Sequence, residues 1–264
     1  MIGRRALAVF RFEFGRSLTV SRLTGWLVLV LFPVFLISIV KYYDVNADPL
    51  AGMPHVTQPT WGTFLFGLIP EVITLLGLLL WATPVVHSEL EGRTWIFVAV
   101  RPRGRVSILL GKYLAAVAWT VLAGWTSASV CILIIHPQHP WQLWLVINAL
   151  VLLSSVAYGA LYCMIGTLIQ QRAMVIAVAY TLIFEFLISL VPALFNKLTI
   201  SYRLRNLLFN WMSWRDQLDP NIRVIMGDEP SWLHLVVLGC ITVALLVAAI
   251  QIIQRTEYVT AREA

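Results

Sequence analysis

The chain has 264 residues, of which 59% are hydrophobic and 12% are charged, and its formal net charge is +6. Soluble domains carry about a quarter charged residues, so this composition excludes a sizeable soluble domain and indicates a membrane protein. The positive charge does not indicate a nucleic-acid partner, because no soluble domain is left to present a basic face.

The first 22 residues are expected to form an amphipathic helix in the plane of the bilayer interface. Apolar residues recur there at spacings of three and four, among arginines and one glutamate: Leu7, Phe10, Phe14 and Leu18. A disordered basic arm is the alternative interpretation of the same residues.

Six apolar stretches follow that are suited to membrane-crossing helices, which need about 20 residues each. They cover residues 23–40, 63–86, 106–135, 143–169, 174–195 and 232–253. We therefore expect an all-α integral membrane protein with six transmembrane helices in a single domain, residues 1–264.

The distribution of lysine and arginine predicts the orientation of the chain in the cell membrane. Residues 1–22 hold five arginines, and the segment after the second stretch adds four more. Short loops rich in positive charge remain in the cytoplasm, so both termini are expected on that side of the membrane. The segment 196–231, with five positive residues, indicates the opposite by itself, but the other loops outweigh it.

The third and fourth stretches are expected to pack against each other. Small residues recur in both at a spacing of four, which lets two helix backbones approach closely. These residues are Ala116, Thr120, Gly124 and Ala128 in the third stretch, and Ser155, Gly159, Cys163 and Thr167 in the fourth.

Two glutamates lie within apolar stretches. Glu185 is about halfway along the fifth stretch, and Glu71 is within two turns of the outer end of the second. An ionisable residue at such a depth is costly, which makes both residues candidates for a functional site. The alternatives are a structural hydrogen-bond partner for Glu185 and a simple contact with water for Glu71.

The segment 196–231 contains apolar residues at helical spacing, among them Leu204, Leu207, Leu208 and Trp211. Trp211 and Trp214 are suited to the depth of the lipid headgroups. We expect an amphipathic helix on the outer surface, before the sixth membrane span.

No motif for a catalytic site, a metal or a bound cofactor is present in the sequence. Residues 104–113, GRVSILLGKY, have six residues between the glycines where a phosphate loop has four, and no Ser or Thr follows Lys112. His87 precedes Glu89 without the second histidine of a zinc motif. If ATP drives this protein, another chain binds it.

The segment 87–113, between the second and third stretches, resembles the corresponding part of the membrane subunits of type-2 ATP-binding-cassette (ABC) exporters. The resemblance is carried by Glu89, Glu91, Gly92, Thr94, Arg101, Pro102, Arg105, Gly111 and Lys112. The chain also resembles that family in its expected six spans, cytoplasmic termini and amphipathic N-terminal helix. Arg93 departs from the pattern, because the family often joins Gly92 and Thr94 directly.

The resemblance implies a permease subunit of an export system that works as a dimer with two ATPase subunits. ATP and magnesium belong to those ATPase subunits, and a cytoplasmic coupling helix contacts them. The coupling residues that it implies are Glu89, Glu91, Gly92, Thr94, Trp95, Ile96 and Phe97. Arg101, Arg103, Arg105 and Lys112 are expected to anchor the loop at the lipid headgroups. Glu185 and Glu71 are expected along the substrate path.

Two other functions stay open. If Glu71 and Glu185 meet in space, the chain is suited to a membrane-embedded enzyme, such as an intramembrane protease or a lipid-modifying transferase. The second is a mechanical membrane adaptor of an ATPase that has no substrate. The substrate, and the choice between homodimer and heterodimer, also stay open.

Overall fold

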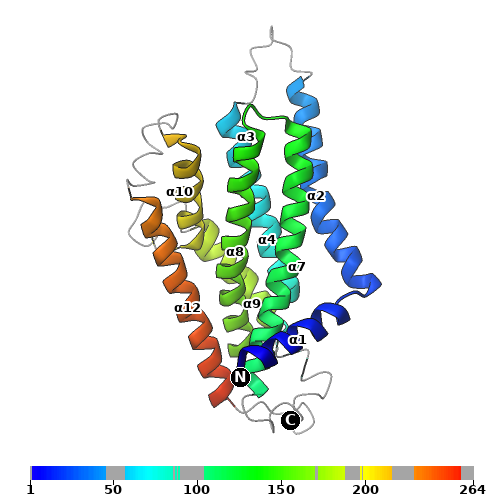
Figure 1. Ribbon diagram of the computed structural model, residues 1–264, viewed down its shortest axis with the longest axis vertical. Helices are drawn as coiled ribbons and strands as arrows, with labels where there is room; N and C mark the ends of the chain where they lie inside the picture. The colour runs from blue at the N-terminus through cyan, green and yellow to red at the C-terminus, as the bar shows by residue number, and fades with distance from the viewer. Residues whose placement is uncertain are drawn as a thin grey trace.

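The computed structural model describes residues 2–45, 57–85, 87, 89, 104–169, 172–187, 197, 199–215 and 229–256. These residues form a bundle of helices, most of which run along the long axis of the molecule (Figure 1). The elements are α1 (Ile2–Arg16), α2 (Val20–Val45), α3 (Gln58–Phe66), η2 (Gly67–Ile73), α4 (Thr74–Trp81), α7 (Gly104–Ile135), α8 (Pro140–Leu168), α9 (Ala173–Tyr180), η3 (Thr181–Leu187), α10 (Ile200–Met212) and α12 (Ser231–Arg255). Two of them, η2 and η3, are π-helical.

Five helices among the described residues are long and apolar enough to cross a membrane. They are Arg22–Val45, Gln58–Trp81, Gly104–Ile135, Pro140–Leu168 and Ser231–Arg255. The expected fifth span begins with a shorter apolar helix, Ala173–Glu185, and residues 188–195 lie outside the described part. Five of the six expected stretches thus form helices of sufficient length and hydropathy, and the crossing of a membrane by six spans stays a prediction.

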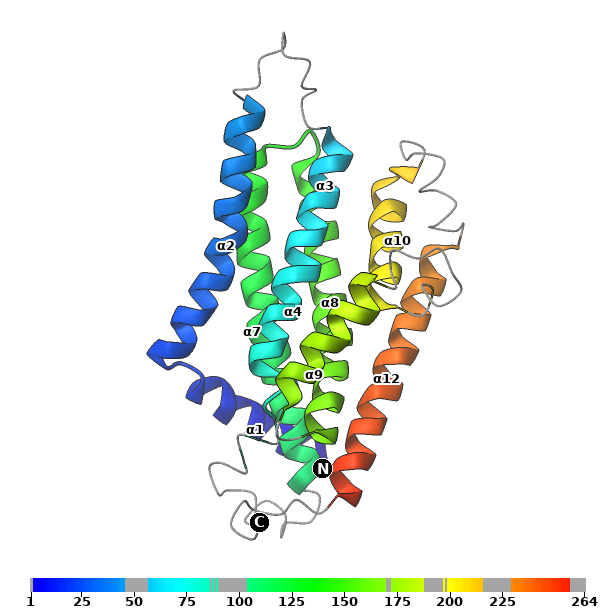
Figure 2. The ribbon, with the colours of Figure 1, turned by 180° about the vertical axis from the view of Figure 1, so that it is seen from behind.

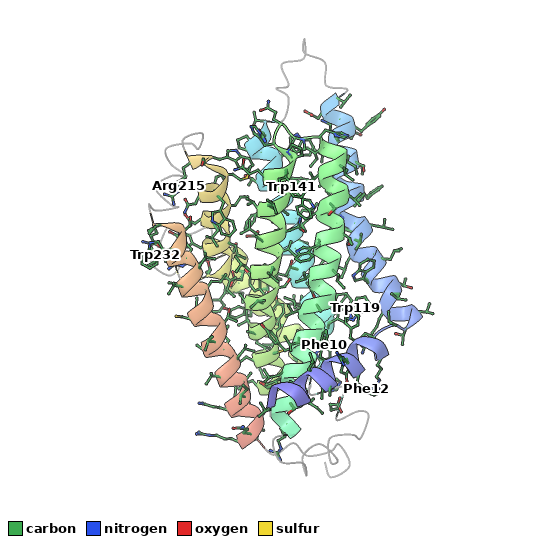
Figure 3. All side chains as sticks on the ribbon, in the orientation of Figure 1. Phe10, Phe12, Trp119, Trp141, Arg215 and Trp232 are labelled. Atoms are coloured by element: carbon green, nitrogen blue, oxygen red, sulfur yellow. The ribbon has the colours of Figure 1, made fainter. Side chains whose placement is uncertain are left out.

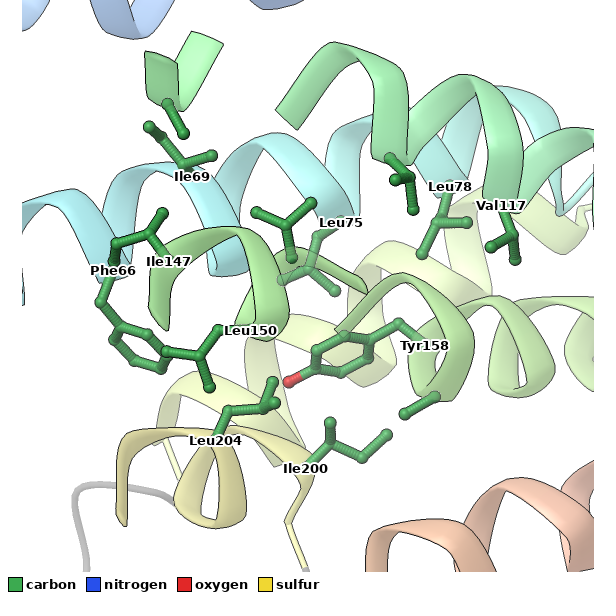
Figure 4. Close-up of a cluster of buried hydrophobic side chains, with 14 of the residues drawn as sticks. Phe66, Ile69, Leu75, Leu78, Val117, Ile147, Leu150, Tyr158, Ile200 and Leu204 are labelled. Atoms are coloured by element: carbon green, nitrogen blue, oxygen red, sulfur yellow. The ribbon is translucent and has the colours of Figure 1, made fainter. Parts of the chain in front are cut away.

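The centre of the bundle is formed by α4, α7 and α8, as the predicted close packing of the third and fourth spans requires. A Cβ atom built on Gly124 of α7 would lie 2.6 Å from a methyl carbon of Val151 on α8. Gly159 of α8 approaches Tyr113 of α7 in the same way, at 3.1 Å. Figure 4 shows the apolar side chains that fill the space between these helices. The packing of the third stretch against the fourth is confirmed.

The N-terminal helix α1 lies across one end of the bundle, which we call the α1 end (Figure 1). It crosses α7 at Gly111, where an added Cβ would lie 2.5 Å from a methyl carbon of Val9. Phe14 stacks on Trp119 of α7 with a centroid distance of 4.9 Å, whereas Phe12 is exposed (Figure 3). A helix lies where the spacing of apolar residues predicted one but ends at Arg16, and its place at a membrane interface stays a prediction. The last turn of α12 lies at the same end of the bundle (Figure 1).

Helix α10 does not lie on the surface as an isolated amphipathic helix, which corrects the expectation for this segment. It packs between α8 and α12 at the opposite end of the bundle, the α10 end (Figure 1). Ten of its 13 residues are buried. In Figure 2, α9 lies in the lower half of the bundle and α10 in the upper half, where α10 packs beside α12. The polar face of α10 is buried because its side chains find partners on neighbouring segments.

Candidate functional site

Both glutamates of the apolar stretches lie in π-helical segments. Glu71 belongs to η2 and Glu185 to η3. A π-helical turn is wider than an α-helical one and occurs frequently at functional sites. In η2 the widening coincides with Pro70, which has no N–H group to donate. The carbonyl oxygen of Pro70 accepts a hydrogen bond of 2.5 Å from the Ser154 hydroxyl of α8.

The two carboxylates meet at Ser201, in the first turn of α10. The Ser201 hydroxyl donates a short hydrogen bond to Glu71 Oε1, and its backbone N–H donates to Glu185 Oε2 at 3.0 Å. The Tyr158 hydroxyl of α8 donates to the same Oε2 atom at 2.8 Å, and Figure 4 shows it pointing toward the start of α10. A helix N-terminus favours negative charge, so the position of Glu185 suits a carboxylate. Four elements, η2, α8, η3 and α10, thus share one polar site.

A small cavity separates these groups. It is about 10 Å³, the size of one water-sized sphere, and is lined by Glu71, Leu75, Tyr158, Glu185 and Ser201. Glu185 is 3% exposed, and its Oε1 atom has no hydrogen-bond partner in the described part of the chain. An unpaired buried acceptor costs stability, because its bonds to water are lost without replacement. A residue that lines the cavity therefore has a buried acceptor suited to an additional donor.

A wider groove opens on the other side of Glu71. It has a volume of about 510 Å³, and its lining is mostly apolar: Thr60, Thr63, Phe64, Gly67, Leu68, Glu71 and Val72. Glu71 lines both the groove and the cavity, and its side chain is half-buried. The expectation that Glu71 and Glu185 belong to one path is consistent with this arrangement.

One positive charge lies beside the two carboxylates. A guanidinium nitrogen of Arg205, one helical turn after Ser201, donates to the Ser201 hydroxyl at 3.5 Å. Among the described residues, no group of three or more His, Cys, Asp or Glu side chains is arranged to hold a metal ion. If both carboxylates are ionised, the site has one more negative charge than positive charge.

A second polar cluster holds α10 against the start of α12. Arg203 donates to Glu229 Oε2 at 2.6 Å and lies 3.2 Å from Nδ1 of the buried His234, while Lys197 donates to Glu229 Oε1 at 3.0 Å. Burial alone would raise the pKa of Glu229, but the hydrogen bond from Lys197 and the charge of Arg203 outweigh it and lower that pKa. The hydrogen bond to Glu229 also raises the pKa of Lys197. These contacts fix Ser201 beside the two carboxylates of the site.

At the α1 end, the structure describes only part of the segment expected to contact an ATPase. Glu89 is buried, and its Oε1 atom lies 2.6 Å from Lys112 Nζ on α7. Lys112 also donates to the Val85 carbonyl at 3.2 Å. The other expected coupling and anchoring residues lie outside the described part: Glu91, Gly92, Thr94, Trp95, Ile96, Phe97, Arg101 and Arg103.

Two residues expected at the lipid headgroups make contacts within this chain. Lys112 is 9% exposed, because the Glu89 carboxylate holds its ammonium group inside the bundle. Arg105 donates to the carbonyls of Ile253, Gln254 and Thr256 at 3.3–3.4 Å. An arginine at this place satisfies carbonyl groups that a helix leaves unpaired at its C-terminus. Lys112 is therefore buried rather than exposed at the headgroups, whereas the expectation for the half-buried Arg105 stays a prediction.

Sequence reasoning identified Glu71 and Glu185 but not Ser201, Tyr158 or Arg205. Serine and tyrosine are common in membrane spans, and nothing in their spacing indicated a shared site. Ser201 and Arg205 were not identified because the sequence does not show that the polar face of α10 is buried. No protein-family model matches the sequence, and no curated protein matches it either. The function is therefore inferred from the arrangement of these residues.

Proposed function

We propose that the chain is the permease subunit of an ABC transporter. In this proposal it forms a substrate path together with a second permease subunit and exports its substrate. ATP hydrolysis in two separate ATPase subunits drives the movement. The observation that carries the proposal is the continuous helical segment α3–η2–α4, which runs from the Glu71 site to Trp81, eight residues before Glu89 in the sequence.

This segment is suited to transmit motion. The ten helical steps from Glu71 to Trp81 span roughly 15 Å at about 1.5 Å per step. Lys112 binds both Glu89 and the Val85 carbonyl, so it joins the end of this segment to α7. A force applied beyond Glu89 would therefore displace α4 and α7 together and reach Glu71.

The polar site itself favours a transporter. Transporters commonly bind substrates between the two ends of the bundle, where discontinuous helices place polar groups. Here the regular α-helix gives way to π-helical turns at both glutamates, η2 around Glu71 and η3 around Glu185. The apolar groove next to Glu71 supplies a place for a substrate, which an adaptor without a substrate does not need.

A membrane-embedded enzyme is the second candidate, because two carboxylates from different helices do meet at Ser201. A hydrolase or transferase needs room for its substrate beside the acid and the base. The cavity between Glu71 and Glu185 holds about one water-sized sphere, and the Ser201 hydroxyl already donates to Glu71. The site therefore supports binding better than catalysis.

Co-purification from gently solubilised membranes tests the proposal. The tagged chain should bring a stoichiometric ATPase subunit with it, identified by mass spectrometry. Trp95→Ala should reduce the recovery of that ATPase, because aromatic anchors contribute much of the energy of an interface. Trp232→Ala is the matched control, since Trp232 is 62% exposed and lies at the α10 end (Figure 3). A chain recovered alone in repeated preparations would contradict the proposal and favour the enzyme.

A further inference from the structure

We propose that the Glu71–Glu185 site binds the primary ammonium group of an amphiphile whose apolar chain occupies the groove beside Glu71. The inference deepens the proposed transport function by naming the class of substrate. It rests on the cavity between the carboxylates, on the unpaired buried acceptor of Glu185, which lines that cavity, and on the groove that shares Glu71 with it.

The cavity offers acceptors that match an ammonium group. A primary ammonium has three N–H donors and no acceptor. Glu185 Oε1 has no hydrogen-bond partner among the described residues, although Glu185 is only 3% exposed. The Glu71 carboxylate and the Tyr158 phenol oxygen line the same cavity. Three oxygen-bearing groups thus surround one small space, and one of their oxygens is a buried acceptor without a donor.

The size of the cavity selects among cations. At about 10 Å³ it accepts one group of the size of water, which is also the size of –NH₃⁺. A trimethylammonium group is several times larger and would have to displace Leu75, Tyr158 or Ser201. The geometry therefore favours a primary amine over a quaternary one.

The charges of the site are consistent with a cationic ligand. Two carboxylates share the site with the Arg205 guanidinium, which reaches Ser201. A bound ammonium would compensate the remaining negative charge in surroundings where a buried charge is otherwise costly. The adjoining α12–α10 cluster supplies no further compensation, because Glu229 there already accepts from Arg203 and Lys197.

The groove suits the apolar part of the ligand. Phe64, Leu68 and Val72 follow one another at helical spacing along its wall, and its volume of about 510 Å³ is within the range of small-molecule sites. Gly67 leaves the middle of the wall without a side chain, and no described atom lies within 4 Å of a Cβ built there.

Binding to the full chain in nanodiscs of phosphatidylcholine, a lipid without a primary amine, tests the proposal. The probe is radiolabelled dodecylamine, with dodecanol and dodecyltrimethylammonium as competitors. Dodecylamine should bind at least about tenfold more tightly than either, since a hydrogen bond to a charged group contributes roughly that factor. Equal affinity for the amine and the alcohol would overturn the proposal.

Three variants locate the site. Glu185→Gln keeps an acceptor for Tyr158 and Ser201 but removes the charge, so amine affinity should fall roughly 10- to 100-fold. Asp44→Asn removes the same charge at the end of α2 and should bind normally. Gly67→Phe should fold, because the added ring enters open space, and should block the groove. Unchanged amine affinity in Glu185→Gln or in Gly67→Phe would overturn the assignment.

The outcome is independent of the ATPase. Binding is measured on the chain without a partner, so loss of the amine site would leave the co-purification result untouched. Conversely, absence of an ATPase would refute the transport proposal without removing amine binding.

Discussion

Replacing Lys112 by methionine should destabilise the α1 end of the bundle strongly. Lys112 Nζ lies 2.6 Å from Glu89 Oε1, and the two side chains are 10% and 7% exposed. Methionine preserves the apolar length of the side chain but leaves the buried Glu89 carboxylate without this ammonium group. Breaking a buried pair in this way costs about 3–5 kcal/mol. At about 2–4 °C per kcal/mol, the apparent Tm should fall by roughly 6–20 °C.

Thermal unfolding of the detergent-solubilised chain, followed by tryptophan fluorescence at one fixed scan rate, measures this effect. The double variant Lys112→Met with Glu89→Gln should recover most of the lost stability, because no uncompensated charge then stays buried. A double-mutant cycle with Glu89→Gln alone isolates the energy of the pair. A decrease below about 2 °C in Lys112→Met, equivalent to 1 kcal/mol or less, would refute the reasoning.

Three further predictions concern other parts of the bundle. Gly166→Ala should lower the apparent Tm by several degrees, because the new methyl group would collide with the Thr83 carbonyl oxygen, whereas Gly25→Ala, with no described atom within 4 Å, should leave it unchanged or raise it. Glu229→Gln should lower the Tm at neutral pH, and the difference from wild type should shrink as the pH falls below the unfolded pKa of about 4.3 and disappear once the pH passes the lowered pKa of the folded state. The sign follows from the lowered pKa of Glu229, since a carboxylate of this kind stabilises the fold above its unfolded pKa and loses that effect when it is protonated. A Tm difference that grows toward acid pH would contradict it. Tyr158→Phe removes a donor from a buried carboxylate and should cost about 1–3 kcal/mol, and an unchanged Tm would show that the hydrogen bond contributes little.

Much of the fold followed from local properties of the sequence. Runs of apolar residues predicted the long helices, of which α2, α7, α8 and α12 agree closely with the expected stretches. The small residues of α7 and α8 predicted their close contact, and Gly124 provides it against Val151. Such predictions succeed because helix formation and close helix packing depend on residues three or four positions apart.

The segment 196–231 shows where this reasoning stops. Its alternation of apolar and charged residues predicted a helix, and α10 is one. The same alternation is typical of a helix at a membrane surface, and it did not indicate that Arg203 has partners on α12 that allow it to be buried. The position of α10 depended on Glu229 and His234, which lie 26 and 31 residues further along the chain.

The sequence by itself therefore determined that the chain is helical and apolar enough for a membrane. It also showed two acidic residues, Glu71 and Glu185, within apolar stretches, where an ionisable group is costly. Only the tertiary structure decided that Glu71 and Glu185 share Ser201, and that Glu89 pairs with Lys112 inside the bundle. The physical reason is that the cost of a buried charge is visible in its local surroundings, whereas the group that compensates it comes from another helix. Which helix supplies that group depends on how the whole bundle packs.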